Sequence, residues 1–187
     1  MYYHRLNTKQ SDDKLIYEDK KSKDLSFNVQ ASDDGKYLML IESPGTEHIN
    51  TISYADISES KLDKVLKFTK ITEELKAEYG IIQNVGTKFF LETNKNAPKG
   101  KVVMLDIANY DKKNPSNSMV EVIPEHQKNV LKGVNCYGGK MVVLSMENAV
   151  DKLKVYDFNV PAKFLHEIKL PGLGSIPEPH GTTGKPN

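Results

Sequence analysis

The sequence has no tryptophan and a single cysteine, Cys136, among its 187 residues. One cysteine excludes a disulfide within the chain and any zinc site built from several cysteines. Lys and Arg number 26 and Asp and Glu 25, so the chain lacks the excess charge that nucleic acids or anionic membranes attract. Apolar runs stay far below the roughly 20 residues of a membrane-spanning helix, and no charged-then-apolar signal segment opens the chain. We therefore expect a cytoplasmic protein with no nucleic-acid or membrane partner.

The motifs of common catalytic and nucleotide-binding sites are missing as well. There is no Gly-x-Ser-x-Gly segment to present a hydrolase serine, and no Gly-x-x-x-x-Gly-Lys-Ser/Thr loop to hold phosphates. The five histidines never stand three, four or five residues apart, so no local pair of metal ligands exists. The sequence therefore predicts no catalytic residue, no metal and no cofactor in this chain.

An internal repeat of about 51 residues is present, and a period of this length indicates a repeat architecture. A lysine that follows a turn and precedes an apolar run recurs at intervals of 52 residues: Lys36, Lys88 and Lys140. A second apolar segment follows each lysine, and its central residues stand 51 residues apart: Tyr54, Leu105 and Tyr156. Another step back of 51 residues lands on Tyr3 in an apolar segment of the same kind.

Each repeat contains four short runs that are rich in β-branched and aromatic residues and bounded by turn residues, which is typical of strands. The expected strands are 25–30, 37–41, 51–57 and 65–71, then 79–83, 88–93, 101–107 and 119–123, then 131–137, 140–146, 153–158 and 164–170. Four antiparallel strands in a repeat of 40 to 50 residues describe a β-propeller blade. A helix over 59–79 is the competing interpretation of one segment, where Lys and Glu are frequent.

The predicted fold class is therefore all-β, with about three and a half four-stranded antiparallel blades. Blades are expected at 21–72, 73–124 and 125–171, preceded in 1–20 by the two outer strands of another blade and followed by an irregular Pro- and Gly-rich tail at 172–187. Even a four-bladed ring needs about 200 residues, so we expect this chain to be part of a larger propeller.

Two kinds of candidate site residue stand out in the repeat. An aspartate ends the second apolar segment of each unit, and these three aspartates could form a ring of carboxylates or cap turns at strand ends: Asp56, Asp106 and Asp157. The turn-capping role is favoured, because a blade repeats its architecture. Cys136 occupies the repeat position of the polar residues Ser32 and Asn84, which predicts partial accessibility, although a lone cysteine is more often a small apolar core residue.

The order and spacing of several segments resemble the N-terminal propeller of the prolyl oligopeptidase (prolyl endopeptidase) family. The segments are 2–13, 31–37, 122–131 and the stretch from Cys136 to Asp157, and the likeness extends from Tyr2 to Ile176. The chain departs from the family at Lys132 and Gly133, in its lack of tryptophan and in its Pro-rich ending.

This resemblance implies a seven-bladed propeller that gates access to a serine-type endopeptidase which cleaves short peptides after proline. The implied partners are the hydrolase domain of the same polypeptide and short proline-containing peptides. The family's catalytic triad lies in that hydrolase domain, so this chain alone is expected to be inactive, and Cys136 falls on a family cysteine that lines the substrate cavity. The alternative function is a non-enzymatic propeller scaffold that binds other proteins.

Overall fold

The computed structural model describes residues 1–22, 24–59, 62–72, 75–172 and 174–177. In these residues the regular structure is β-strand, with two short 3-10 helices at Gln10–Asp12 and Pro115–Ser118. No described helix has the length and apolar character needed to cross a membrane. The chain divides into two compact units, Met1–Glu78 with Lys112–Ser116, and Tyr79–Asp111 with Asn117–Asn187.

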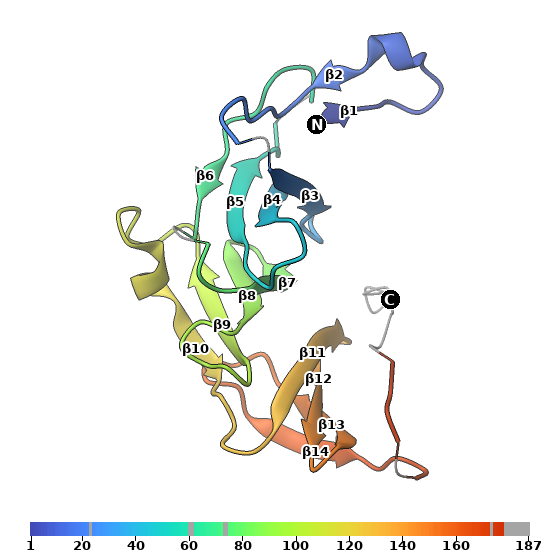
Figure 1. Cartoon of the computed structure of the whole chain (residues 1–187), viewed down its shortest axis with the longest axis vertical. Coiled ribbons are helices and arrows are strands. Elements are labelled where there is room, and N and C mark those ends of the chain that lie inside the picture. Colours follow the sequence, from blue (N-terminus) through green and yellow to red (C-terminus); the bar gives the residue numbers. More distant parts are fainter. Residues whose placement is uncertain (23, 60–61, 73–74, 173, 178–187) are drawn as a thin grey trace. The chain divides into compact units, whose positions relative to one another are not determined.

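The first unit contains a small two-stranded sheet and one four-stranded sheet (Figure 1). Strands β1 (Tyr2–Tyr3) and β2 (Lys14–Leu15) pair antiparallel. The larger sheet has the order β3 (Leu25–Ala31), β4 (Tyr37–Pro44), β5 (Thr51–Asp56) and β6 (Thr69–Lys70). Each strand of this sheet therefore pairs with its neighbour in the sequence, as the repeat predicted.

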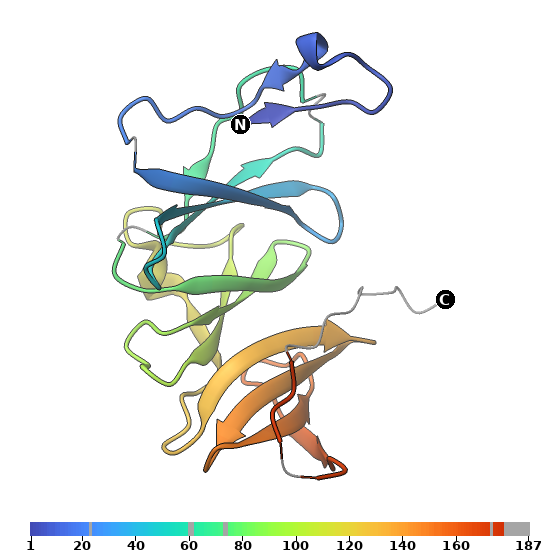
Figure 2. The same ribbon diagram turned by 45° about the vertical axis from the view of Figure 1, so that its right-hand side comes forward.

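The second unit contains two further four-stranded antiparallel sheets, and Figure 2 shows their marked twist. The first consists of β7 (Tyr79–Val85), β8 (Lys88–Thr93), β9 (Lys101–Asp106) and β10 (Val120–Ile123) in chain order. The second consists of β11 (Val130–Tyr137), β12 (Lys140–Glu147), β13 (Val150–Tyr156) and β14 (Phe164–Ile168). The two first strands, β7 and β11, lie next to each other, as the first strands of adjacent blades do in a propeller.

The recurring lysines take equivalent places at the hairpins between the first and second strands. Lys88 and Lys140 are the first residues of β8 and β12, and Lys36 directly precedes β4. Glycines with positive φ come before these lysines, and Gly35, Gly86 and Gly139 have φ of 69°, 59° and 71°. Glycine adopts this conformation without steric cost, so the repeated turn chemistry determines where each second strand begins.

The stretch before β6 differs from the expected strand at 65–71. Only Thr69–Lys70 pairs with β5, and no described residue between 62 and 72 is helical. The backbone N–H of Leu66 instead donates to the carbonyl of Ile16 at 2.8 Å, and the ring of Phe68 packs edge-on against Tyr17 at 5.3 Å. These contacts turn the segment toward the N-terminal residues. The expected fourth strand is therefore present but shorter than predicted, and the helix interpretation was wrong for the described residues 62–72.

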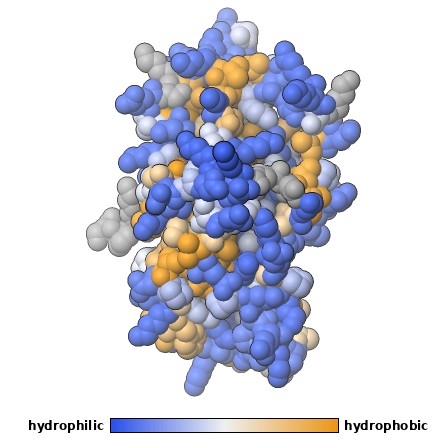
Figure 3. Space-filling model, turned by 90° about the vertical axis from the view of Figure 1, so that its left-hand side faces the viewer, coloured by the Kyte–Doolittle hydropathy of each residue, from blue (hydrophilic) through white to orange (hydrophobic). Residues whose placement is uncertain are grey.

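The apolar core follows the middle strands of each sheet. In the first unit, Met39, Leu40 and Ile52 are almost fully buried. In the second unit, buried side chains from both sheets form one cluster: Phe90, Val102, Met104, Val122, Val134, Cys136, Met141 and Val143. All residues of the last strand, β14, are exposed. On the face drawn in Figure 3, apolar surface is divided into separate patches among hydrophilic side chains.

Candidate functional site

The structure places Cys136 inside the second unit. It lies near the end of β11, opposite Met141 of β12, and is only 4% exposed. Its neighbours in the buried cluster include Phe90 and Val102 of the preceding sheet. The partial exposure expected for this thiol is therefore not present in this structure.

Ser32 and Asn84, which occupy the repeat positions equivalent to Cys136, show why polarity at these positions did not predict an exposed thiol. The hydroxyl of Ser32 donates to Asp34 at 2.7 Å and accepts the backbone N–H of Tyr37 at 2.9 Å. The amide of Asn84 donates to the carbonyl of Gly86 at 3.0 Å, although Asn84 is itself buried. Both residues are polar because they stabilise the following turn, so their polarity does not report solvent access.

The three recurring aspartates have the structural role that was favoured. Asp56, Asp106 and Asp157 each accept a hydrogen bond from the backbone N–H two residues further on, at 2.9, 3.1 and 3.2 Å. The carboxylate of Asp56 also accepts a hydrogen bond from the hydroxyl of Ser58, and the carboxylate of Asp157 accepts one from the backbone N–H of Lys163. This arrangement is an Asx turn at the end of a strand.

Hydrogen bonding also changes the ionisation of two of these carboxyl groups. The hydroxyl and backbone N–H of Ser58 hold the pKa of Asp56 below its usual range, and the backbone N–H of Lys163 does the same for the pKa of Asp157. Both shifts favour the charged form that the turn uses. Within the described ranges, no group of three or more His, Cys, Asp or Glu side chains could hold a metal ion.

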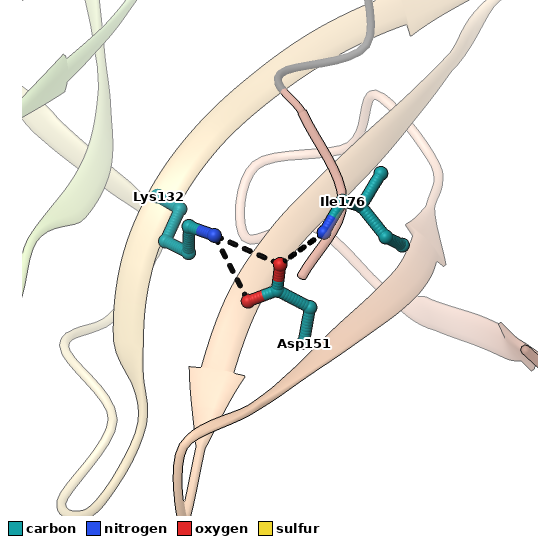
Figure 4. A network of polar contacts seen from close by, with 3 residues as sticks. All are labelled: Lys132, Asp151 and Ile176. Atoms are coloured by element: carbon teal, nitrogen blue, oxygen red, sulfur yellow. Dashed lines mark hydrogen bonds and ion pairs between the residues drawn. The ribbon is translucent and has the colours of Figure 1, made fainter. Parts of the chain in front are cut away.

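A polar contact that sequence reasoning missed joins Lys132 to Asp151 (Figure 4). The ammonium of Lys132 on β11 donates to both carboxylate oxygens of Asp151 on β13, at 3.0 and 2.8 Å. The backbone N–H of Ile176 donates to the same carboxylate at 2.6 Å, and the N–H of Asp151 donates to the carbonyl of Gly174 at 3.3 Å. Asp151 is 1% exposed. No spacing in the sequence indicates this contact, because its partners lie 19 and 25 residues apart.

The side-chain hydrogen bond from Lys132, followed by the N–H of Ile176, lowers the pKa of Asp151. The carboxylate is therefore held in its charged form by a cation and a backbone donor, as a buried charge requires. The contact connects the residues after the last sheet to that sheet. Because Asp151 is buried and both of its carboxylate oxygens already accept hydrogen bonds, we assign this contact to structure.

Three four-stranded antiparallel sheets, each with its strands in chain order, define an all-β protein built from propeller blades. The sequence profile described as "Prolyl oligopeptidase, N-terminal beta-propeller domain" matches residues 1–187. The chain belongs to the prolyl oligopeptidase family and corresponds to part of its N-terminal propeller domain.

Individual relatives agree with this family. "Prolyl oligopeptidase A" of Amanita bisporigera is 34% identical over 158 residues, which are 84% of this chain and 20% of that protein. "Prolyl endopeptidase" of Elizabethkingia miricola is 31% identical over 176 residues, 94% of this chain and 23% of that protein. The chain thus spans between a fifth and a quarter of the length of these relatives.

Solved structures show the same fold. Prolyl oligopeptidase B from Galerina marginata bound to a 25mer macrocyclization substrate matches with a TM-score of 0.85 and 28% identity, over 94% of this chain and 23% of that one. Its apo form matches with a TM-score of 0.82 and 26% identity, over 94% of this chain and 24% of that one.

Proposed function

We propose that this chain is the substrate-gating propeller segment of a serine-type endopeptidase that cleaves short peptides after proline. The observation that carries the proposal is the match of all 187 residues to the propeller domain of that family. The peptide-bound structure of a relative adds support, because a chain region of the same fold is present in a protein that binds peptide. In the complete protein the propeller would be seven-bladed, with the residue ranges 21–72, 73–124 and 125–171 as consecutive blades.

The partners that follow are the hydrolase domain of the same polypeptide and short proline-containing peptides. A ring of blades around a central channel admits extended peptides and excludes folded proteins by size. The catalytic serine, base and oxyanion donors belong to the hydrolase domain in this proposal. We also propose that the complete protein is cytoplasmic. This location is inferred from the sequence alone, and cell fractionation tests it.

Cys136 is the residue of this chain that we propose to lie nearest the substrate cavity. It stands one residue from the end of β11, the first strand of its blade, and first strands lie closest to the channel of a propeller. Because its sulfur is buried here, a reagent would reach it only when the end of β11 opens. The thiol would take no part in catalysis. A bulky reagent attached to it would instead obstruct the entry of peptides through the channel.

The coding sequence downstream of Asn187 provides the first test. The proposal requires a Gly-x-Ser-x-Gly segment there, followed by the acidic residue and histidine of a hydrolase triad. The complete product should hydrolyse a Gly-Pro chromogenic peptide and leave casein intact. A downstream sequence without the serine motif would support the scaffold function instead.

A thiol reagent tests the gating residue in that complete product. A bulky maleimide should inactivate it, and Cys136→Ser should keep most of the activity while losing sensitivity to the reagent. Equal inactivation of both forms would remove Cys136 from the proposal.

A further inference from the structure

A pocket of about 260 Å³ lies in the second unit, where the connection between β10 and β11 meets the sheet β11–β14. Its apolar wall is formed by Ile123, Pro124, Leu131, Val143 and Ala162. One water molecule occupies about 30 Å³ in the liquid, and pockets for drug-sized ligands start at about 300 Å³. The volume therefore suits an organic molecule of about amino-acid size.

Two buried oxygen atoms of residues that line this pocket lack hydrogen-bond partners among the described residues. They are Oδ1 of Asn129 and Oγ of Ser145, from side chains that are 4% and 7% exposed. The other end of the Asn129 amide is oriented by Glu147, whose carboxylate accepts from Nδ2 at 3.4 Å. Leaving a buried polar atom unpaired costs free energy, so both positions favour a ligand that supplies the missing bonds.

The pocket also has more positive than negative charge. Lys154 and Lys101 line it, against the single carboxylate of Glu125. Lys154 is half-buried and has no partner among the described residues, and Glu167, which stands opposite it on β14, is paired with Lys152 at 3.2 Å.

The remaining charges near the pocket do not balance this excess. Among the described residues, the ammonium of Lys101 has one long ion pair, at 3.8 Å from the carboxylate of Glu121. The carboxylate of Glu125 already accepts the backbone N–H of Lys99 at 2.7 Å. An anionic ligand group would therefore find an unpaired cation at Lys154.

The rim of the pocket is held in place by a dense set of backbone contacts. Nδ1 of His126 accepts the N–H groups of Lys128 and Asn129 at 3.1 and 3.0 Å. The N–H of Leu131 donates to the carbonyl of Lys99 at 2.7 Å. The segment that carries Asn129 is thus fixed before any ligand arrives, which lowers the entropic cost of binding.

We propose that this pocket binds a small N-acylated amino acid, a molecule with an apolar group, a secondary amide and a carboxylate. The amide N–H would donate to Oδ1 of Asn129, and the acyl oxygen would accept from the hydroxyl of Ser145. The carboxylate would lie at Lys154, and the apolar side chain would pack on Leu131 and Val143. The C-terminal residue of a peptide presents the same groups and is the second source of this chemistry. The proposal does not depend on the proposed function.

The test is a titration of the ¹⁵N-labelled 187-residue chain with N-acetyl-leucine, followed by backbone amide shifts. Saturable shifts are expected at Asn129, Leu131, Ser145 and Lys154. N-acetyl-leucinamide, which lacks the carboxylate, should bind about tenfold more weakly, as the loss of a charge-assisted hydrogen bond predicts. N-acetyl-glycyl-glycyl-leucine distinguishes the two sources of the ligand. If it binds as tightly as N-acetyl-leucine, the ligand is a peptide C-terminus, and if it binds more weakly, the ligand is a free N-acyl amino acid. Absent saturation, or equal affinity for the acid and its amide, would overturn the proposal.

Two variants separate ligand binding from folding. Ser145→Ala removes a hydroxyl that has no partner in the free protein, so the thermal midpoint should stay equal or rise while affinity for N-acetyl-leucine falls several-fold. Lys154→Met should weaken binding about tenfold, and the exposed Lys140→Met on β12 is the matched control that leaves affinity unchanged. Unchanged affinity in Ser145→Ala, or shifts that map to other residues, would contradict the proposed site.

Discussion

The ammonium group of Lys132 reaches across the intervening strand β12 to both carboxylate oxygens of Asp151, at 3.0 and 2.8 Å. The carboxylate is almost completely buried, whereas the Lys132 side chain keeps 30% of its surface exposed. Removing the cation therefore leaves a buried negative charge that, among the described residues, keeps the backbone N–H of Ile176 as its donor.

Lys132→Met is expected to lower the urea midpoint of unfolding, and Lys140→Met, the exposed control, should leave it within error. Adding Asp151→Asn to Lys132→Met should recover part of the loss, because the neutral amide no longer needs a cation. The double-mutant cycle isolates the coupling between the two side chains. Equal midpoints for Lys132→Met and the control would show that the pair contributes nothing to stability.

Stability should decrease in acid. Folding lowers the pKa of Asp151, Asp56 and Asp157 from the ordinary value of 3.8, so the unfolded chain binds protons more readily than the folded one. Their contribution is complete above the unfolded pKa and is lost as pH falls through the lower folded values. We expect a constant urea midpoint from about pH 5 to pH 7 and a decline below about pH 4. Asp151→Asn should flatten that decline, and an identical pH profile would contradict the assignment.

Gly100→Ala should destabilise the protein more than Gly138→Ala. Both glycines have positive φ, 83° and 53°, where an L-residue costs about 1–2 kcal/mol. A Cβ at Gly100 would in addition lie 2.7 Å from Cβ of Leu131, whereas nothing lies within 4 Å at Gly138. Denaturation curves of the two variants measure the difference, and a smaller effect at Gly100 would show that Leu131 moves without cost.

Cys136 should react slowly with a thiol reagent in the folded chain. Its burial against Met141 and Phe90 predicts modification at least about 100-fold slower than in urea, because reaction requires local opening. Absorbance of released thionitrobenzoate measures both rates. Modification at the unfolded rate would contradict the packing of this end of β11.

The 187-residue chain should not hydrolyse a Gly-Pro chromogenic peptide, because its sequence carries no serine nucleophile motif with an associated base. The measurement needs a mock purification from the same host as its control. Turnover that exceeds the mock and is abolished by a serine-directed reagent would contradict this expectation.

Local sequence patterns predicted most of the strands for a simple physical reason. A glycine or aspartate turn followed by an alternating apolar run specifies a hairpin through nearest neighbours, so Lys88–Thr93 was predicted with its observed bounds. The repeated aspartates were assigned correctly on the same grounds, since their partners lie two residues away. The length of β6 was overestimated because the backbone N–H of Leu66 bonds to Ile16, a contact 50 residues distant in sequence.

The candidate sites depended on tertiary structure. Cys136 carries no local sign of whether its thiol faces a channel or a core, and packing against Phe90 of another sheet determined its burial. The contact of Lys132 with Asp151 joins residues 19 positions apart on two strands, and the pocket brings Asn129, which precedes β11, together with Ser145, 16 positions further on. The repeat and its turns therefore follow from the sequence alone, because neighbouring residues specify them. The packing of strands that are distant in sequence determines the burial of the Asp151 carboxylate and leaves oxygen atoms of Asn129 and Ser145 without hydrogen-bond partners among the described residues. Short-range sequence patterns do not encode this packing.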